Sequence, residues 1–119
     1  MNLAEALDQN ALRRPGAPAV ITAHETISHA EFRDWVCRLA AHLSALGVAR
    51  DDIVGVNLND TPAHLAALFA LARIGAAALP MDWRWTVEEK SRLAEFFAPR
   101  LVLSEPDDAF TEVAGDWLS

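Results

Sequence analysis

Hydrophobic residues in the first fifty positions recur every three or four residues in two stretches, the spacing of an amphipathic helix. The first stretch predicts a helix over residues 3–13, with Asn2 as its N-terminal cap. Ser28 and Glu31 form a capping box that opens a longer helix, and Gly47 supplies the left-handed residue that ends it. The apolar faces predicted for the two helices are Leu3, Ala4, Leu7, Ala11 and Leu12 in the first, and Phe32, Val36, Leu39, Ala40, Leu43 and Leu46 in the second.

The predicted strands are of two kinds. Residues 19–22 and 25–28 are short runs around the polar connection Ala23-His24, which predicts an antiparallel hairpin. Residues 53–58 form an apolar, β-branched run without strict alternation, which is typical of a parallel strand covered on both faces. Two shorter strands of the same set are expected at residues 76–79 and 101–103.

Helical segments lie between these apolar runs. Thr61 before Pro62 is an N-cap followed by proline at the first helical position. The helix that it opens is apolar on nearly every face until Gly75, so we expect it to be largely buried. A second capping box at residues 86–89 opens a helix that runs to about Phe97.

The alternation of strand and helix predicts an α/β fold with a mostly parallel sheet, right-handed connections and helices on both faces, preceded by the short hairpin. We interpret the chain as a single partial domain. Its parts are an N-terminal helix, hairpin and long helix at 1–50, a βαβαβ unit at 51–105 and a C-terminal tail at 106–119.

Composition narrows the classes of partner. The 119 residues are 52% hydrophobic and 23% charged, as in an ordinary globular protein rather than a disordered one. The net charge is −7 and the basic residues form no cluster, so we expect no nucleic-acid partner. The longest nearly apolar run, 65–80, contains Arg73 and is too short to span a bilayer, so no membrane span is expected. Cys37 is the only cysteine, which fits a reducing compartment, and we predict a cytoplasmic protein.

The sequence contains cysteine, glycine and histidine residues, but not at the spacing that a catalytic, phosphate-binding or metal-binding site requires. Cys37 lies inside a helical pattern, which favours a packed, inert thiol over a nucleophile. The glycines are scattered and form no phosphate-binding loop. The histidines, His24, His29, His42 and His64, have no metal-ligand spacing, and solvent-facing positions are expected. His64 is the exception, because it lies early on an apolar helix, where a packing role outweighs catalysis. Asp107-Asp108 is most simply a solvated turn.

The best local candidate for a site is Met81-Asp82-Trp83-Arg84-Trp85, which follows a predicted strand. The carboxyl ends of parallel strands are where ligands usually bind in open α/β sheets. A structural role is the stronger interpretation: Trp83 and Trp85 would cover the end of the sheet while Arg84 pairs with Asp82 or a nearby carboxylate.

Four stretches, in this order, resemble the opening of the adenylate-forming acyl-CoA synthetases, enzymes that activate a carboxylate with ATP. They are SHAEF at 28–32, GVARDDIVGV at 47–56, FALARIGAAALPMDWRWTVEE at 69–89 and PRLVLSE at 99–105. Residues 80–84 are similar to a Pro-x-Asn-x-Arg pattern of the acyl-CoA ligase branch, more than to the amino-acid-activating domains of peptide synthetases. Asp82 departs from the usual asparagine, His29 replaces a common tyrosine, and Asp60 stands where asparagine is frequent.

The resemblance implies a parent enzyme that uses ATP, Mg²⁺ and coenzyme A. Such enzymes bind ATP through a Ser/Thr/Gly-rich loop ending in lysine, and they use a second lysine on a mobile C-terminal domain; both would lie downstream of this chain. Lys90, the one lysine here, is expected on an exposed helix. We therefore predict no catalytic, cofactor-binding or metal-binding residue in 1–119, and an isolated chain that is inactive, because no groups are assembled to stabilise a transferring phosphoryl group.

Two functional hypotheses stay open. In the first, the chain is the N-terminal structural part of an acyl-CoA synthetase of fatty-acid type, and its partner is the remainder of that enzyme. In the second, it is a stand-alone, non-catalytic protein-interaction module with the same fold. A stop codon directly after Ser119 would favour the second. In either case the sheet ending at Leu103 would leave an edge or an apolar face exposed, so we predict a homo-oligomer.

Overall fold

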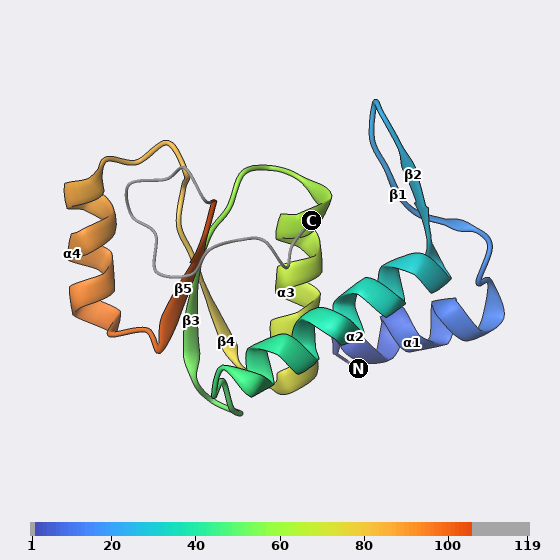
Figure 1. Ribbon diagram of the computed structural model, residues 1–119, viewed down its shortest axis with the longest axis horizontal. Helices are drawn as coiled ribbons and strands as arrows, with labels where there is room; N and C mark the ends of the chain where they lie inside the picture. The colour runs from blue at the N-terminus through green and yellow to red at the C-terminus, as the bar shows by residue number, and fades with distance from the viewer. Residues whose placement is uncertain (1, 106–119) are drawn as a thin grey trace.

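The computed structural model describes residues 2–105, which form a helical N-terminal half with a hairpin and a βαβαβ unit (Figure 1). In chain order the elements are α1 (Leu3–Arg13), β1 (Pro18–Ile21), β2 (Thr26–Ser28), α2 (His29–Ala45), β3 (Ile53–Asn57), α3 (Pro62–Ile74), β4 (Ala77–Pro80), α4 (Val87–Phe97) and β5 (Leu101–Ser104). Every predicted helix and strand is present. The tail predicted at 106–119, with the turn at Asp107-Asp108, lies outside the described residues.

Side chains cap most of the predicted helix starts. Asn2, Ser28 and Thr86 each accept the backbone N–H of the residue three positions later, at 3.0, 3.1 and 3.2 Å. Such a bond satisfies one of the donors that a helix start leaves unpaired. Thr61 occupies the predicted cap position of α3 but its side chain makes no cap hydrogen bond. Gly75 ends α3 with φ +87°, the left-handed conformation that glycine adopts without a Cβ clash.

The hairpin is present with strands displaced by about one residue from the prediction. The cause is Thr22, whose hydroxyl oxygen accepts the backbone N–H groups of His24 at 3.2 Å and Glu25 at 3.1 Å. These bonds make Thr22 and Glu25 turn residues instead of strand residues. In Figure 1 the hairpin projects away from the helices to which it is joined.

The sheet has the order β4-β3-β5 and both pairings are parallel. Its central strand, β3, is buried from Val54 to Asn57, as the apolar run predicted. The helices α2 and α3 lie on one side of the sheet and α4 lies on the other (Figure 1). The expected α/β fold with helices on both faces is therefore confirmed.

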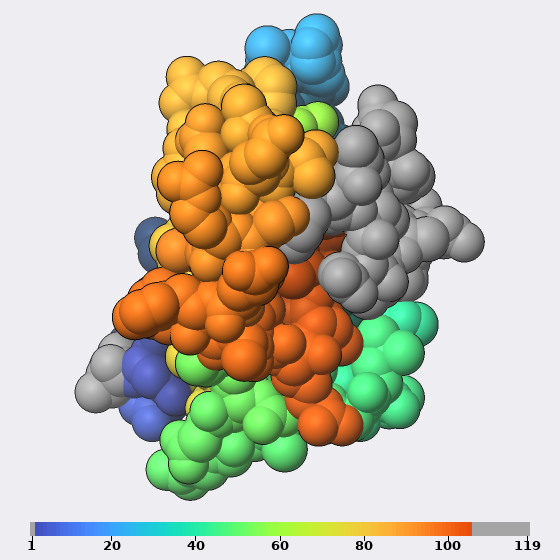
Figure 2. Space-filling view, turned by 90° about the vertical axis from the view of Figure 1, so that its left-hand side faces the viewer, coloured from blue at the N-terminus to red at the C-terminus, as the bar shows by residue number. Residues whose placement is uncertain are grey.

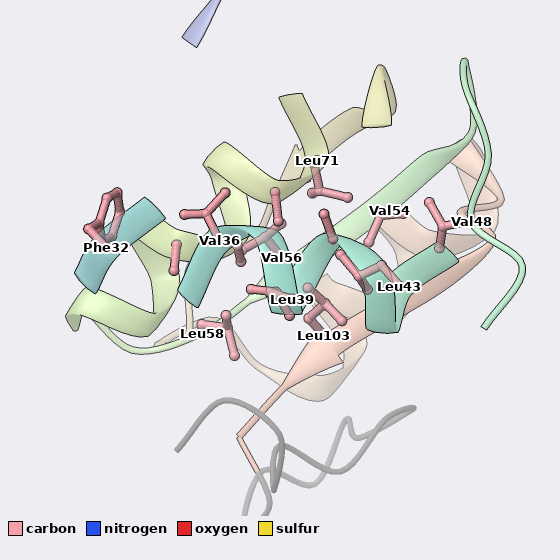
Figure 3. Packing of buried hydrophobic residues seen from close by; sticks show 14 of the residues in the cluster. Phe32, Val36, Leu39, Leu43, Val48, Val54, Val56, Leu58, Leu71 and Leu103 are labelled. Atoms are coloured by element: carbon pink, nitrogen blue, oxygen red, sulfur yellow. The ribbon is translucent and has the colours of Figure 1, made fainter. Parts of the chain in front are cut away.

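Nearly all of the hydrophobic core lies between the sheet and α2 with α3. Val54 and Val56 of β3 and Leu103 of β5 pack with side chains of the two helices, and each is fully buried (Figure 3). The helix residues of this cluster include Leu39, Leu43, Ala66, Ala67, Ala70 and Leu71. Burying a leucine or valine of this kind contributes roughly 1.5–3 kcal/mol, so this face supplies most of the hydrophobic stabilisation.

The α4 side of the sheet is more polar. Alternation along the strands directs Gly55, Asn57, Val102 and Ser104 to this face. Asn57 and Ser104 are fully buried, and Asn57 Nδ2 donates to Ser104 Oγ at 3.1 Å. Figure 2 shows this side of the molecule, with α4 and the segment before it forming part of the outer surface.

Several sequence predictions about exposure are wrong. Lys90 was expected on an exposed helix, yet it is 3% exposed, and its Nζ donates to the Trp83 carbonyl oxygen at 3.1 Å. A lysine can be buried in this way because its long apolar stem packs while the ammonium group finds an oxygen. Leu3 and Leu12 were assigned to the apolar face of α1 but are 50% and 83% exposed, because α1 buries only Ala4 and Leu7. Leu46 was assigned to the apolar face of the next helix but is 43% exposed, because it follows the last residue of α2.

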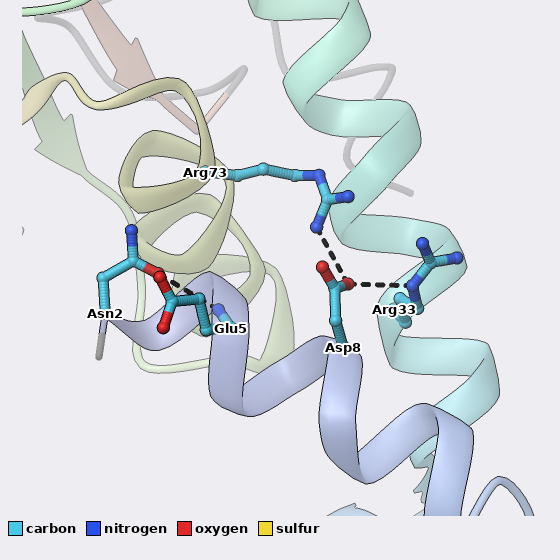
Figure 4. Close-up of polar contacts among 5 residues, drawn as sticks. All are labelled: Asn2, Glu5, Asp8, Arg33 and Arg73. Atoms are coloured by element: carbon cyan, nitrogen blue, oxygen red, sulfur yellow. Dashed lines mark hydrogen bonds and ion pairs between the residues drawn. The ribbon is translucent and has the colours of Figure 1, made fainter.

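A shared carboxylate joins the three helices of the N-terminal half. Asp8 of α1 accepts from Arg33 Nε of α2 at 2.9 Å and from Arg73 Nη1 of α3 at 3.0 Å, both through Oδ1 (Figure 4). Burial raises the pKa of Asp8, but hydrogen bonds from Arg73 and Arg33 and the two positive charges outweigh it, so the pKa lies below its ordinary 3.8.

Candidate functional site

The topology marks one place on the sheet edge where a ligand or partner can bind. The connection leaving the carboxyl end of β3 enters α3 on one face, and the connection leaving β4 enters α4 on the opposite face (Figure 1). Because β3 and β4 are neighbours, their departing chains separate and leave a crevice at the carboxyl edge. In open α/β sheets ligands bind at such a topological switch point.

A depression of about 380 Å³ lies at this point. It is lined by Leu58, Asp60 and His64 from the β3 connection and the start of α3, and by residues 80–85 from the β4 connection. The structure therefore brings together the two features that the sequence singled out separately, His64 and the segment 81–85. His64 is half-buried, whereas Trp83 and Trp85 are 44% and 39% exposed.

Arg84 and Asp82 form the strongest polar contact of the segment. Arg84 Nε donates to Asp82 Oδ1 at 3.0 Å and Arg84 Nη2 donates to Oδ2 at 2.7 Å, a two-pronged arrangement. The Arg84 backbone N–H also donates to Oδ1 at 3.0 Å. The side-chain and backbone hydrogen bonds from Arg84 lower the pKa of Asp82 to about 2. The predicted pairing is confirmed, and it occupies the guanidinium that would otherwise be offered to an anion.

Lys90 holds the same segment through its bond to the Trp83 carbonyl oxygen. The positive charge of Lys90 also contributes to the lowered pKa of Asp82. The tryptophans were predicted to cover the end of the sheet, but their exposure leaves much of each indole at the surface. The segment is thus a fixed loop that presents two aromatic rings beside an ion pair.

A larger depression, of about 520 Å³, lies where β3 and β5 begin. It is lined by Asp52 and Arg100, whose charged groups are 3.7 Å apart. This depression lies at the amino ends of the strands, away from the edge where α/β folds usually bind ligands. It is therefore the weaker candidate.

The remaining histidines and the cysteine lie apart from the switch point. His24 and His42 are exposed, as expected, whereas His29 is half-buried and so departs from the solvent-facing position expected for it. Cys37 is also half-buried on α2. Among residues 2–105 no three His, Cys, Asp or Glu side chains gather as a metal site would require.

Sequence reasoning missed Asn57, Ser104 and Asp8. Asn57 could have been noticed as the one polar residue inside the apolar run at 53–58. The Asp8 contacts join residues 25 and 65 positions apart, and no local pattern indicates them.

Comparison with known proteins identifies the family. A family model described as AMP-binding enzyme matches residues 7–117. The chain belongs to the AMP-binding enzyme family. The resemblance to the N-terminal portion of the adenylate-forming enzymes, noted from the sequence, is thereby confirmed. No helix within residues 2–105 is both long and apolar enough to cross a bilayer.

Relatives in the AMP-binding enzyme family include ligases and peptide synthetases. Indoleacetate–CoA ligase of Aromatoleum aromaticum is 35% identical over 98% of this chain, which spans 24% of that protein. A plipastatin synthase polypeptide of Bacillus subtilis is 31% identical over 93% of this chain, which spans 4% of it. The chain therefore corresponds to a quarter or less of these relatives.

The fold of this AMP-binding family member is also found among solved structures. The N-terminal subdomain of Klebsiella oxytoca NpsA, in complex with 3-hydroxybenzoyl-AMSN, matches with a TM-score of 0.86 at 22% identity. The match covers 98% of this chain and 31% of that one. At this identity the likeness shows the fold alone.

Proposed function

We propose that the chain is the N-terminal structural part of a longer ATP-dependent acyl-CoA synthetase. In that reaction a carboxylate oxygen bonds to the α-phosphorus of ATP and pyrophosphate leaves, giving an acyl-adenylate. The coenzyme A thiol then bonds to the acyl carbon, loses its proton, and AMP leaves. The observation that carries the proposal is the 35% identity to indoleacetate–CoA ligase over 98% of the chain.

The residues at the switch point support the ligase branch of the proposal. Residues 80–84 keep the Pro-x-x-x-Arg spacing of the acyl-CoA ligases. Asp82 replaces the usual asparagine of that pattern, and its two hydrogen bonds from the Arg84 side chain hold the loop. A fixed loop at the end of the sheet suits a scaffold that supports a cleft built by other parts of the enzyme.

We further propose that residues 1–119 alone are inactive and that the rest of the enzyme supplies the groups that bind ATP, Mg²⁺ and coenzyme A. Stabilising a transferring phosphoryl group requires cations that are free to approach it. Four arginines among residues 2–105 are paired with carboxylates: Arg84 with Asp82, Arg33 and Arg73 with Asp8, and Arg100 with Asp52. The division at residues 50 and 105, a cytoplasmic location, a role in fatty-acid metabolism and a homo-oligomeric state stay predictions.

The test is to express the full reading frame that contains this chain and to measure carboxylate-dependent pyrophosphate release, followed by thioester formation with coenzyme A. We expect release with at least one acid from a broad panel, and no release from residues 1–119. If no acid supports release by the longer protein, the proposal is wrong.

An amino-acid-activating domain of a peptide synthetase is the second candidate, favoured by the 31% identity to plipastatin synthase. In that case amino acids would support pyrophosphate release, and coenzyme A would not accept the acyl group. The gene sequence distinguishes the stand-alone interaction module from both enzyme candidates, because the module requires a stop codon directly after Ser119.

A further inference from the structure

A depression of about 510 Å³ lies between the end of α1 and the start of α2. The two helices run antiparallel there, because the Ala30 backbone N–H donates to the Pro15 carbonyl oxygen at 3.0 Å while Arg33, one turn further along α2, reaches Asp8 (Figure 4). In Figure 1, α1 and the start of α2 lie at the opposite end of the molecule from α4. We call this surface the Leu12 groove; its lining residues are Asp8, Ala11, Leu12, Ala30, Arg33 and Asp34.

The Leu12 groove combines a hollow with a protruding side chain. The small side chains of Ala11 and Ala30 line the hollow. Leu12 lies beside them and is 83% exposed, the highest value among the large hydrophobic side chains of residues 2–105. An apolar side chain left in water to this extent gains free energy when it is buried. A two-fold axis beside the groove would bring the Leu12 side chain of each copy to the hollow of the other.

The charges around the groove are mixed, unlike those of the chain as a whole. Residues 8–14 and 30–38, which contain the groove, hold four arginines and three acidic residues, a balance of +1, whereas the complete chain carries −7. Two chains that are each this acidic repel one another at most of their surface. Where both signs are present, positive groups of one copy can meet negative groups of the other. A second copy of the chain is therefore the occupant that this groove fits.

We propose that two copies of the protein associate through the Leu12 groove about a two-fold axis. Leu12 of each copy fills the hollow of the other. Along the groove, Arg13 follows Leu12 towards the end of α1, whereas Asp34 lies one turn beyond Ala30, beside the middle of α1. The two-fold rotation reverses this direction, so Arg13 of one copy lies opposite Asp34 of the other. None of these residues lies at the switch point, so the proposal goes beyond the proposed function and does not depend on it.

The expected dimer is weak. A groove with one leucine anchor per copy buries little surface, and interfaces below about 1,200 Å² are typical of transient association. We therefore expect a reversible dimer, populated in concentrated samples and dissociated in dilute ones, so that the unfolding of dilute samples reports on single chains. A segment elsewhere in the same polypeptide is a different occupant, and it would bury Leu12 without any dependence on protein concentration.

The first test is sedimentation equilibrium of the full-length protein over a series of concentrations, in which the weight-average mass should rise from one copy towards two. Leu12→Glu should weaken association at least about tenfold, because each dimer loses two buried leucines. Leu12→Met keeps an apolar side chain of similar volume and should associate like the unsubstituted protein. Because Leu12 is exposed in the single chain, neither variant should disturb folding. A monomer at all concentrations, or a dimer that Leu12→Glu leaves intact, would overturn the proposal.

The second test exchanges charges across the axis. Arg13→Glu alone, or Asp34→Arg alone, places like charges in both symmetric contacts and should weaken association roughly threefold or more. In an equimolar mixture of these two variants, both contacts of the mixed dimer again join opposite charges, so association should return to near that of the unsubstituted protein. Mixing would not relieve the misfolding of a variant. An absence of recovery in the mixture would refute the two-fold arrangement.

Discussion

Replacing Asp8 with alanine should loosen the junction of α1, α2 and α3. One carboxylate oxygen accepts from both Arg33 and Arg73, at 2.9 and 3.0 Å. The side chains of Asp8 and Arg33 are each 41% exposed and that of Arg73 is 29% exposed, so water weakens both ion pairs. Exposed pairs contribute about 0.2–1 kcal/mol each, so the two pairs that share one carboxylate sum to about 0.4–2 kcal/mol.

Asp34→Ala is the matched control, because it also replaces an exposed helical aspartate by alanine and gains the same helix propensity. With a urea slope of about 1.5 kcal/mol per M, a loss of about 0.4–2 kcal/mol lowers the unfolding midpoint by roughly 0.3–1.3 M. In urea unfolding of residues 1–119 at pH 7, the midpoint of Asp8→Ala should therefore lie roughly 0.3–1.3 M below that of Asp34→Ala. High salt should narrow the difference, since these charges are partly exposed.

The pH dependence follows from the lowered pKa of Asp8. A carboxylate whose pKa in the folded state lies below its unfolded value of 3.8 stabilises the fold above that value. The contribution is lost as the pH falls through the folded pKa. The difference in unfolding free energy between Asp8→Ala and Asp34→Ala should thus be largest at about pH 5–7 and should disappear in more acidic solution. If Asp8→Ala is no less stable than Asp34→Ala at neutral pH, the shared carboxylate does not join the helices as the geometry indicates.

Three further predictions concern the sheet and the switch point. Arg84→Ala should raise the pKa of Asp82 from about 2 towards 3.8, and an unchanged carboxyl titration by NMR would contradict the pairing. Gly75→Ala should lower the free energy of unfolding by about 1 kcal/mol or more, because φ is +87° and the added Cβ would lie 3.2 Å from Arg50 Cγ. Gly16→Ala is the control: its Cβ would meet nothing within 4 Å, so its urea unfolding should be nearly unchanged. Replacing Asn57 by leucine together with Ser104 by alanine should leave the free energy of unfolding unchanged or raise it, because both partners of the buried hydrogen bond become apolar and the unpaired Oδ1 is removed. A lower urea midpoint for the double variant would show that this oxygen is satisfied in solution.

Local patterns were sufficient to predict the fold because each element carries its own boundary signals. Ser28 and Thr86 start helices through bonds to residues three positions away, and Gly47 and Gly75 follow helices with positive φ. The order of strands and helices then restricts the sheet to a parallel, right-handed arrangement. The one-residue error in the hairpin arose from Thr22, whose hydroxyl bonds compete with the strand ladder, a competition that propensity does not include.

The candidate site could be predicted only in part. Residues 81–85 were recognised because they follow a strand, and His64 because it interrupts an apolar helix. That the two lie in one depression depends on α3 and α4 leaving the sheet on opposite faces, which is a property of the whole topology. Lys90 was misjudged for the same reason: its burial depends on the carbonyl oxygen of Trp83, seven positions earlier and outside its helix.

The two faces of the sheet contribute differently to stability. The α2 and α3 face holds the leucine and valine cluster, so most of the apolar burial that stabilises the fold lies there. The α4 face buries Asn57, Ser104 and Lys90, which contribute less per residue and fix geometry through specific bonds. The depression at the switch point opens at the edge between these faces. Substitution of the exposed Trp83 should therefore change the free energy of unfolding much less than substitution of the fully buried Val54 or Leu71.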